Sequence, residues 1–146
     1  MGTPASDHLT EKKLSGTELF KGRLLHAFRD EVSLPDGTQA TREYVVHPGA
    51  VMVVPLLEDS QGQLHVVLER QFRYPLGRVM IEFPAGKLDA GEGCFQCAQR
   101  ELREETGYSA RQWAHAGVLH PLIAYSTEFI DIWFARDLRM GTRQLD

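Results

Sequence analysis

Three glutamates lie within five residues of one predicted helix: Glu101, Glu104 and Glu105. Residues three or four apart on an α-helix share one surface, so these carboxylates repel one another unless positive charge lies between them. They occupy the last turns, where the helix dipole makes negative charge mildly unfavourable. Hard cations such as Mg²⁺ take oxygen ligands and keep positions for water or phosphate. The spacing therefore predicts a metal site suited to phosphate chemistry.

A plainer interpretation is a solvated helix face, on which Arg100 and Arg103 neutralise the glutamates locally. The position of the glutamates at the end of the helix argues against it. A glycine-punctuated segment, with Gly86, Gly91 and Gly93, also precedes the helix directly. Because glycine lets backbone approach a ligand closely, this segment favours a binding site over a solvated face.

The predicted helix covers residues 94–106. Phe95, Ala98 and Leu102 have the spacing of a core-facing stripe, and the charged residues fall mostly outside it. Gly107 is the expected left-handed stop. We therefore expect a buried face and a separate acidic face.

Composition sets the class of protein. The chain has 146 residues, 42% of them hydrophobic, which predicts one soluble globular domain. A formal charge of −4 disfavours a general nucleic-acid binder. The start of the chain lacks a signal-peptide core, and no apolar run is long enough for a bilayer. Cys94 and Cys97 form a lone CxxC that we interpret as helix packing in a reducing compartment. We expect a cytoplasmic protein without membrane or nucleic-acid partners.

The other elements are predicted to be strands. A hairpin is expected over residues 18–46, and a buried central strand over 50–57, with Pro55 at its end or at a bulge. The remaining strands are expected at residues 63–74, 79–83, 113–119 and 128–138.

The strand expected at 63–74 carries two arginines near its end, Arg70 and Arg73. Side chains alternate along a strand, so Arg70 and Arg73 point to opposite faces and at least one faces the interior of the fold. A solvated arginine at the edge of the sheet is the alternative. Glu82, on the next strand, lies on the opposite face from its two apolar neighbours.

Nine residues over positions 86–108 resemble the Nudix box: Gly86, Glu92, Arg100, Glu101, Leu102, Glu104, Glu105, Gly107 and Tyr108. The resemblance implies an α/β fold, the Nudix α/β/α sandwich around a mixed β-sheet with its loop–helix–loop, here preceded by an N-terminal antiparallel strand extension. It also implies hydrolysis of a nucleoside diphosphate linked to another moiety. Residues 1–16 are polar and mixed and are expected to form a flexible leader. By the likeness, residues 17–48 form the β extension and 49–146 the Nudix catalytic domain.

The family's site residues transfer by position. Glu101 and Glu105 become the principal metal ligands, and Glu104 a further ligand or a carboxylate that orients water. Arg100 holds the glutamates by ion pairing, and Glu92 supports the box. The backbone carbonyl of Ala85 is an additional ligand. The implied cofactor is Mg²⁺, with Mn²⁺ as the alternative.

Three flanking segments resemble the ADP-ribose pyrophosphatase subgroup: HPGAV at 47–51, RQFRYP at 70–75 and EFPAGKLDAGE at 82–92. The likeness spans residues 19–138. It implies that Arg70 and Arg73 contact phosphate or substrate, that Glu82 lines the site, and that Glu128 contacts the terminal ribose. Members of this subgroup are typically homodimers that exchange N-terminal strands.

The chain departs from the subgroup in two places. Ile123 stands where a proline is common, and the nearest proline is Pro121. The subgroup pattern also continues past the final strand into an acidic loop that supplies a glutamate, whereas the sequence ends at Asp146, so we expect a catalytic domain without its C-terminal part. ADP-ribose is the expected substrate. The alternatives are nucleotide sugars, dinucleoside polyphosphates or NADH, and a Nudix domain that binds nucleotide without catalysis.

Overall fold

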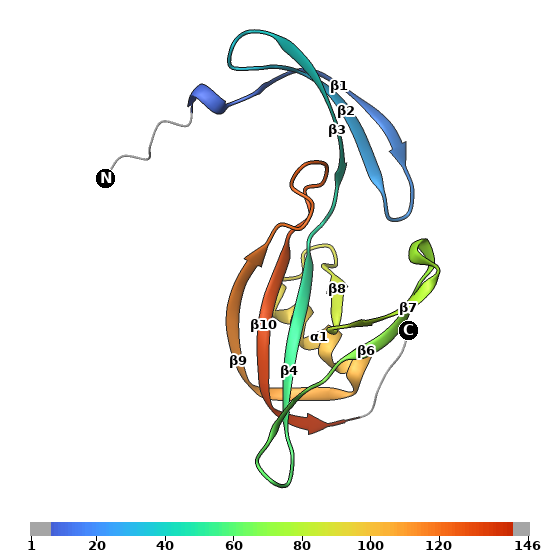
Figure 1. The fold of residues 1–146 in the computed structure, drawn as a ribbon, viewed down its shortest axis with the longest axis vertical. Helices are drawn as coiled ribbons and strands as arrows, with labels where there is room; N and C mark the ends of the chain where they lie inside the picture. Colours follow the sequence, from blue (N-terminus) through green and yellow to red (C-terminus); the bar gives the residue numbers. More distant parts are fainter. Residues whose placement is uncertain (1–6, 142–146) are drawn as a thin grey trace, which may run out of the picture. The chain divides into compact units, whose positions relative to one another are not determined.

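The computed structural model describes residues 7–141, which form two compact units (Figure 1). One unit contains the chain up to His47 together with Leu122–Glu128. The other contains Pro48–Pro121 and the chain from Phe129 onward.

The first unit is a three-stranded antiparallel sheet in the order β1 (Lys12–Lys21), β2 (His26–Ser33), β3 (Gln39–Val46), preceded by the short helix η1 (Asp7–Leu9). The expected antiparallel strands are present. β1 begins at Lys12, inside the segment that polar composition predicted to be a leader. Its side chains are exposed, so backbone pairing to β2 and a 2.9 Å ion pair between Lys13 and Asp30 hold it. Residues 1–6 lie outside the described residues.

The second unit contains a five-stranded mixed sheet. Its order is β5 (Leu64–Val66), β4 (Ala50–Glu58), β10 (Ile130–Met140), β9 (Tyr108–Leu119), and β8 (Ala85–Lys87) also pairs with β4. β10 runs parallel to β4, and the other pairs are antiparallel. The prediction of a buried central strand at β4 is confirmed. Pro55 does not end β4: it lies opposite Ala135, and its carbonyl accepts a hydrogen bond from Val67 N–H at 3.0 Å.

The strand predicted at 63–74 is two strands. After β5, the amide of Val67 makes the hydrogen bond to Pro55, and the chain then leaves the large sheet. β6 (Glu69–Arg73) pairs instead with β7 (Arg78–Glu82), joined through the short helix η2 (Tyr74–Leu76). These two strands form a separate two-stranded ribbon.

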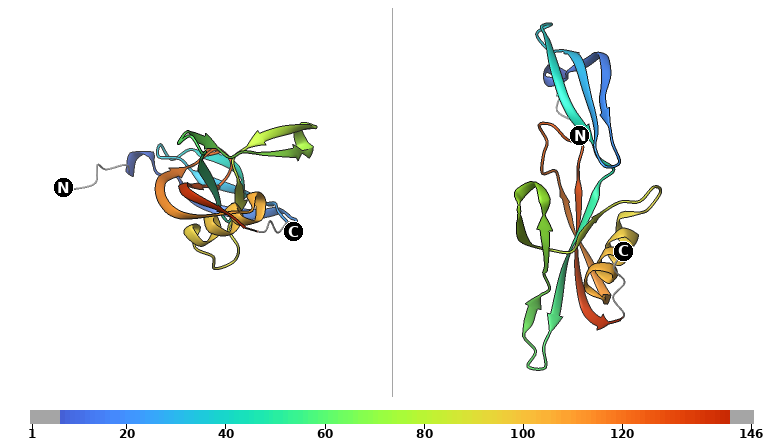
Figure 2. Two further views of the ribbon diagram at one scale, coloured as in Figure 1. Left: turned by 90° about the horizontal axis from the view of Figure 1, so that it is seen from below. Right: turned by 90° about the vertical axis from the view of Figure 1, so that its right-hand side faces the viewer.

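Helix α1 (Cys94–Thr106) packs on one side of the β4, β10 and β9 strands (Figure 2). The core between them contains fully buried residues from both layers: Val51, Val53, Cys97, Ala98, Leu102 and Ala135. This is the mixed sheet and loop–helix–loop of the expected Nudix fold. α1 is the one α-helix in residues 7–141, so a second helical layer is not among them, and no helix there is long and apolar enough to cross a bilayer.

The ends of α1 fall where the glycines predicted them. Gly93 is the N-cap residue, and its N–H donates to the side-chain oxygen of Gln96 at 3.3 Å. Gly107 ends the helix with a left-handed φ of 78°, and its N–H donates to the Arg103 carbonyl at 2.9 Å. This conformation favours glycine.

The predicted separation of the two helix faces is only partly correct. Ala98 and Leu102 are buried as expected, and Phe95 packs against Trp113 and Trp133. Glu101, however, is also buried, with 8% of the residue exposed. Neighbouring β8 covers this side of the helix, which the periodicity of the helix alone does not reveal.

We predict that Leu102→Ala lowers the free energy of unfolding of the second unit by about 2–5 kcal/mol, because Leu102 is fully buried and the cavity would fill only in part. Urea unfolding followed by tryptophan fluorescence measures this, since both tryptophans, Trp113 and Trp133, lie in this unit. Leu76→Ala, the same change at an exposed residue, is the control and should be nearly neutral. Equal losses of unfolding free energy in the two variants would contradict the burial of Leu102.

Candidate active site

Strand β8 brings backbone against the acidic side of α1. Gly86 is the middle residue of β8 and pairs with Val51 of β4. A Cβ atom on Gly86 would overlap the carboxylate of Glu101. Glycine is therefore required here by close approach, and the carboxylate sits in the space that a side chain would fill.

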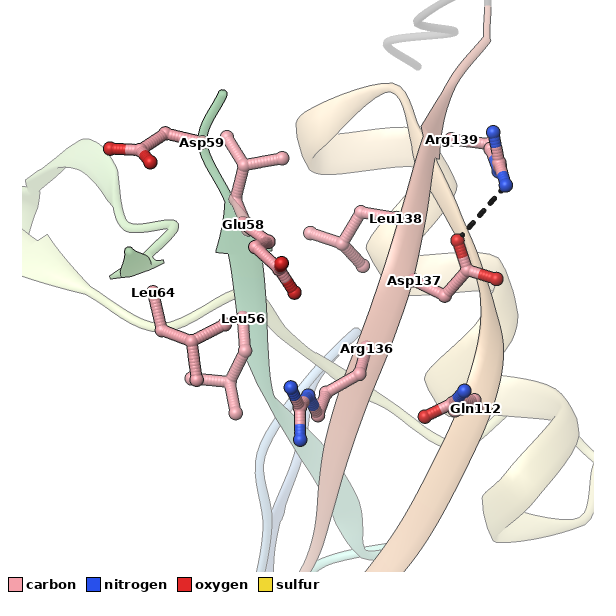
Figure 3. A pocket seen from close by; sticks show the side chains of 10 residues that line it. Leu56, Glu58, Asp59, Leu64, Gln112, Arg136, Asp137, Leu138 and Arg139 are labelled. Atoms are coloured by element: carbon pink, nitrogen blue, oxygen red, sulfur yellow. Dashed lines mark ion pairs between the residues drawn. The ribbon is translucent and has the colours of Figure 1, made fainter. Parts of the chain in front are cut away.

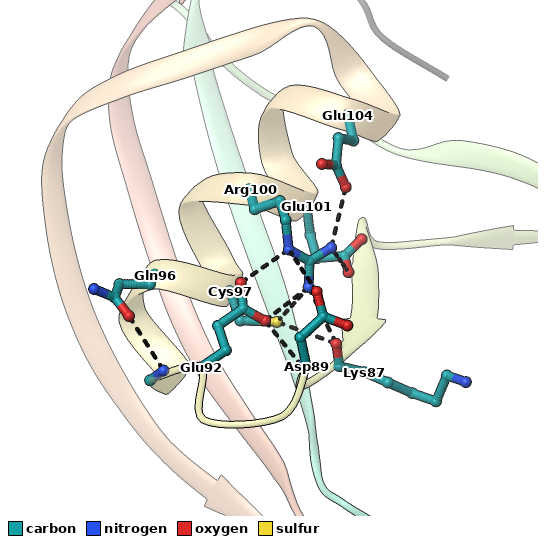
Figure 4. A network of polar contacts seen from close by, with 9 residues as sticks. Lys87, Asp89, Glu92, Gln96, Cys97, Arg100, Glu101 and Glu104 are labelled. Carbon is teal, nitrogen blue, oxygen red and sulfur yellow. Dashed lines mark hydrogen bonds and ion pairs between the residues drawn. The ribbon is translucent and has the colours of Figure 1, made fainter. Parts of the chain in front are cut away.

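The Arg100 guanidinium joins the loop before α1 to the helix (Figure 4). Its Nε and Nη2 donate to the two carboxylate oxygens of Glu92 at 2.9 and 2.8 Å. Its Nη1 donates to Glu101 at 2.7 Å and to Glu104 at 3.0 Å. Nη2 also donates to the carbonyl of Lys87 at 3.2 Å. One side chain thus donates hydrogen bonds to three carboxylates of the acidic segment, and the carboxylate of Asp89 lies 3.9 Å from its Nε.

Arg100 and the carboxylates around it stabilise one another's charged forms. The paired hydrogen bonds from Arg100 lower the pKa of Glu92 from 4.5 to about 2. The same carboxylate, followed by those on the helix, raises the pKa of Arg100. Two parallel hydrogen bonds of this kind are among the stronger polar contacts in proteins. They fix the loop at residues 88–93 to the helix.

Burial acts in the other direction on Glu101 and Glu105. Removal from water raises the pKa of Glu101, and Arg100 opposes this only in part. The pKa of Glu105 rises from 4.5 to about 7, first because of burial and then because of the neighbouring charges of Glu69 and Glu101. The Ala85 N–H donates to Glu105 at 3.0 Å and partly offsets the rise. Both carboxylates lie where negative charge is disfavoured without a cation.

A pocket of about 450 Å³ lies beside Glu105. We call it the β6–α1 pocket, and its lining residues are Val67, Leu68, Glu69, Arg70, Gln71, Glu105 and Thr106. Arg70 lines it and forms no salt bridge within residues 7–141. The structure therefore places Arg70 and Glu105 at one pocket.

Arg73 has a different environment from Arg70. Its guanidinium engages both carboxylate oxygens of Glu82, with an Nε–Oε1 distance of 2.8 Å. This pairing lowers the pKa of Glu82. Glu82 and Arg73 thus tie the β6–β7 ribbon together.

Glu69 was not among the residues singled out in the sequence. It is the first residue of β6, lines the β6–α1 pocket and contacts Glu105 through their side chains. In the ribbon Glu69 lies opposite Glu82. Like charges opposite one another in a hairpin are unfavourable, so this pair could have marked Glu69 as a candidate. That signal required knowledge of the register.

Glu128 belongs to the first unit, unlike the other predicted site residues. Its carboxylate lies 4.0 Å from the His47 ring nitrogen, and its N–H donates to Ser126 Oγ at 3.1 Å. Its predicted contact with a ribose therefore remains a prediction.

A second pocket, of about 410 Å³, lies at the far ends of β4 and β10 (Figure 3). Leu56, Glu58, Leu138 and Arg139 are among its lining residues. It contains none of the residues that the sequence predicted for the site. Of these two pockets, the β6–α1 pocket is the one lined by predicted site residues.

The glutamates of α1 supply carboxylate oxygens, the ligand type that small divalent cations prefer. Burial disfavours the negative charge on Glu101 and Glu105. Gly86 has no side chain, and the Glu101 carboxylate lies in the space that this leaves. In residues 7–141, no three acidic, histidine or cysteine side chains are already arranged around an ion position. Arg100 and the Ala85 N–H hold the carboxylate oxygens instead. Hard carboxylate ligands without sulfur or imidazole suit Mg²⁺ or Mn²⁺.

Comparison with protein families matches residues 46–144 to the NUDIX domain. Residues 11–45 match the nucleoside diphosphate sugar hydrolase N-terminal domain. The chain belongs to the Nudix family. The two matched regions correspond closely to the mixed sheet with α1 and to the three-stranded sheet, respectively.

Relatives of this Nudix chain include pyrophosphatases. ADP-ribose pyrophosphatase of Bacillus subtilis (strain 168) is 34% identical over 140 residues, 94% of this chain and 74% of the relative. The methanol dehydrogenase activator of Bacillus methanolicus is 37% identical over 130 residues, covering 88% and 67%. A crystal structure of ADP compounds hydrolase matches with a TM-score of 0.81 and 25% identity, covering 93% of this chain and 72% of that one. These similarities make the Nudix chain a pyrophosphohydrolase.

We predict that the Glu92–Arg100 contact makes the stability of the second unit pH-dependent. The folded-state pKa of Glu92 is depressed, so its contribution is complete above 4.5 and is lost as pH falls toward 2. The loss should be on the order of 2–3 kcal/mol, and Glu92→Gln should show a correspondingly flatter dependence. Urea unfolding at pH values from about 5 to about 3, with a chelator present, measures the pH dependence of the unmodified chain and of Glu92→Gln.

The matched control is Glu31→Gln, which removes a carboxylate from the first unit. It should retain the pH dependence of the unmodified chain in tryptophan-detected unfolding. Identical pH dependence in Glu92→Gln and the unmodified chain would refute the assignment.

Proposed function

We propose that the chain hydrolyses ADP-ribose to AMP and ribose 5-phosphate. One observation carries the proposal: Glu105, whose negative charge is disfavoured by burial and by the charges of Glu69 and Glu101, lines a pocket that Arg70 also lines. A diphosphate carries negative charge, which a divalent cation held by carboxylates can neutralise and which an arginine can bind through hydrogen bonds. Similarity to an ADP-ribose pyrophosphatase supports the choice of substrate within the family.

The proposed cofactor is Mg²⁺, with Mn²⁺ as an alternative. Glu101 and Glu105 are the principal ligands, with Glu104 and the Ala85 carbonyl as further ones. When bound, such an ion neutralises phosphate charge and lowers the pKa of a coordinated water. Arg100 keeps Glu101 and Glu104 aligned through the contacts described above.

The remaining residues bind and orient the substrate. Arg70 donates hydrogen bonds to phosphate oxygens, and we expect Glu82, which Arg73 holds by paired hydrogen bonds, to line the site. A water oxygen forms a new bond to one of the two phosphorus atoms as the bond from that phosphorus to the bridging oxygen breaks. Glu104 accepts the proton of the water, and the bridging oxygen leaves with the other phosphate.

The wider setting follows the same resemblance. The substrate is a small nucleoside diphosphate derivative rather than a nucleic acid or membrane. We propose that the enzyme acts in the cytoplasm as a homodimer.

We predict that Glu101→Gln lowers AMP release from ADP-ribose about a hundredfold or more, because Lewis-acid stabilisation of the transition state contributes several kcal/mol. Its free energy of unfolding should change little, because relief of the buried charge offsets the weaker contact with Arg100, which an amide oxygen can still accept. AMP formation with Mg²⁺ is followed by chromatography, together with ADP-glucose, a diadenosine polyphosphate and NADH as competing substrates.

Glu58→Gln is the control, because Glu58 lines the second pocket. It should retain full activity. A competing substrate that exceeds ADP-ribose by orders of magnitude in kcat/KM would overturn the substrate assignment. Wild-type rates in Glu101→Gln would overturn the metal assignment, and turnover of no substrate by the unmodified chain would favour nucleotide binding without catalysis.

We predict that Arg70→Ala raises KM for ADP-ribose about tenfold or more, since a hydrogen bond to a charged group contributes about 1.5–3 kcal/mol. The unfolding free energy should stay nearly unchanged. Arg78→Ala, in the same ribbon, is the matched control and should leave KM unaltered. A KM change in the control but not in Arg70→Ala would show that Arg70 does not contact substrate.

A further inference from the structure

The β6–β7 ribbon leaves apolar side chains in solvent. Arg70 pairs with Ile81 and Phe72 with Val79, and side chains directly opposite one another share a face of the ribbon. On this face Phe72 is 58% exposed, Val79 49% and Ile81 66%. Two strands alone are at best marginally stable, and adjacent exposed apolar side chains mark surfaces on which another surface packs. The ribbon therefore has an apolar face to cover.

The outer edge of β7 is open to a further strand. Within residues 7–141, β7 pairs with β6 alone, and its other edge makes no backbone hydrogen bond. β7 contains neither lysine nor proline, which commonly protect such an edge. β6, in contrast, lines the β6–α1 pocket. In Figure 2 the ribbon projects from the large sheet of the second unit. An added strand can therefore pair with β7.

The sequence of β7 is complementary to itself in the antiparallel direction. If two copies of β7 pair around Met80, Arg78 of each copy lies opposite Glu82 of the other, and Val79 lies opposite Ile81. A two-fold axis repeats each of these pairs. Cross-strand pairs of opposite charge or of β-branched residues stabilise a sheet. Apart from the central methionines, every pair in this register belongs to one of these two kinds.

The charges needed for this pairing are available. In the ribbon Arg78 lies opposite Arg73, which is an unfavourable pair of like charges. Arg73 has Glu82 as its partner, and the charge of Glu69 also lies near it. Among residues 7–141, Arg78 forms no hydrogen bond or ion pair. The Glu82 side chain is 24% exposed, so its carboxylate can accept from a second arginine.

We propose that two copies of the chain associate through the outer edge of β7, antiparallel around Met80, to form a four-stranded sheet β6–β7–β7–β6. The proposal rests on the homodimer of the proposed function and names one contact surface of that dimer. The apolar faces of the two ribbons, each with Phe72, Val79 and Ile81, become continuous across the new sheet. The β6–α1 pocket stays outside the contact, because β7 separates β6 from the second copy.

Cysteine cross-linking tests the register. Met80→Cys brings the two introduced thiols opposite one another, where Cα atoms are about 4.5–5.5 Å apart, a distance that a disulfide can span. We expect a covalent dimer on non-reducing gels after oxidation with copper phenanthroline. Gln71→Cys, opposite Met80 on β6, is the matched control and should give no covalent dimer. The unmodified chain, with Cys94 and Cys97, supplies the background.

Charge reversal tests the ion pairs without cross-linking. Arg78→Glu places like charges opposite Glu82 at both ends of the contact and should raise the dimer Kd about tenfold or more, measured by sedimentation velocity. Arg111→Glu makes the same charge change at an exposed residue of β9 and should leave the Kd unaltered. Urea unfolding checks that both variants are folded. Arg78→Glu should fold normally, since it places a glutamate opposite Arg73.

The outcomes separate this contact from the homodimer as such. A dimer whose Kd is unchanged in Arg78→Glu, with no cross-link in Met80→Cys, would refute the β7 contact and leave the homodimer in place. Monomers at every concentration would refute the homodimer of the proposed function as well. Cross-linking of Gln71→Cys but not of Met80→Cys would assign the contact to β6 and overturn the role of β7.

Discussion

Arg100 places one positive charge among carboxylates that would otherwise repel one another. Its guanidinium contacts Glu92 in the loop and Glu101 and Glu104 on the helix. A guanidinium suits this position because it donates in several fixed directions at once, which a lysine ammonium cannot do. The conformation of the loop, the direction of the helix carboxylates and the space left over Gly86 all depend on this set of contacts.

The acidic residues of α1 form a gradient of burial rather than one polar face. Glu92 is stabilised as an anion by Arg100, whereas burial disfavours the charge on Glu101 and Glu105. A protein that buries carboxylates in this way gives up stability unless a ligand compensates. The cost is confined to the side of α1 that faces β8 and the β6–α1 pocket, and the opposite side packs into an ordinary apolar core.

Local signals in the sequence were sufficient to predict much of the fold. Gly93 and Gly107 marked both ends of α1, and the apolar run of β4 predicted a central strand correctly. β8 was missed, because three residues pairing with a distant strand carry no periodic pattern. The burial of Glu101 and the contact of Glu69 with Glu105 depend on which elements pack together. Helical spacing places Glu101 on the polar side, and only the presence of β8 reverses this.

The parallel pairing of β4 and β10 joins residues 50–55 to residues 130–135, some 80 positions later. In contrast, β1, β2 and β3 pair with their immediate neighbours along the chain. Strands that are close in sequence can meet early, whereas a distant pair must first close a long loop. During synthesis the three-stranded sheet can therefore form while the ribosome is still making α1. The central pair of the large sheet cannot form until residues 130–135 have emerged, so β4, the most apolar strand, remains exposed to chaperones and to aggregation until then.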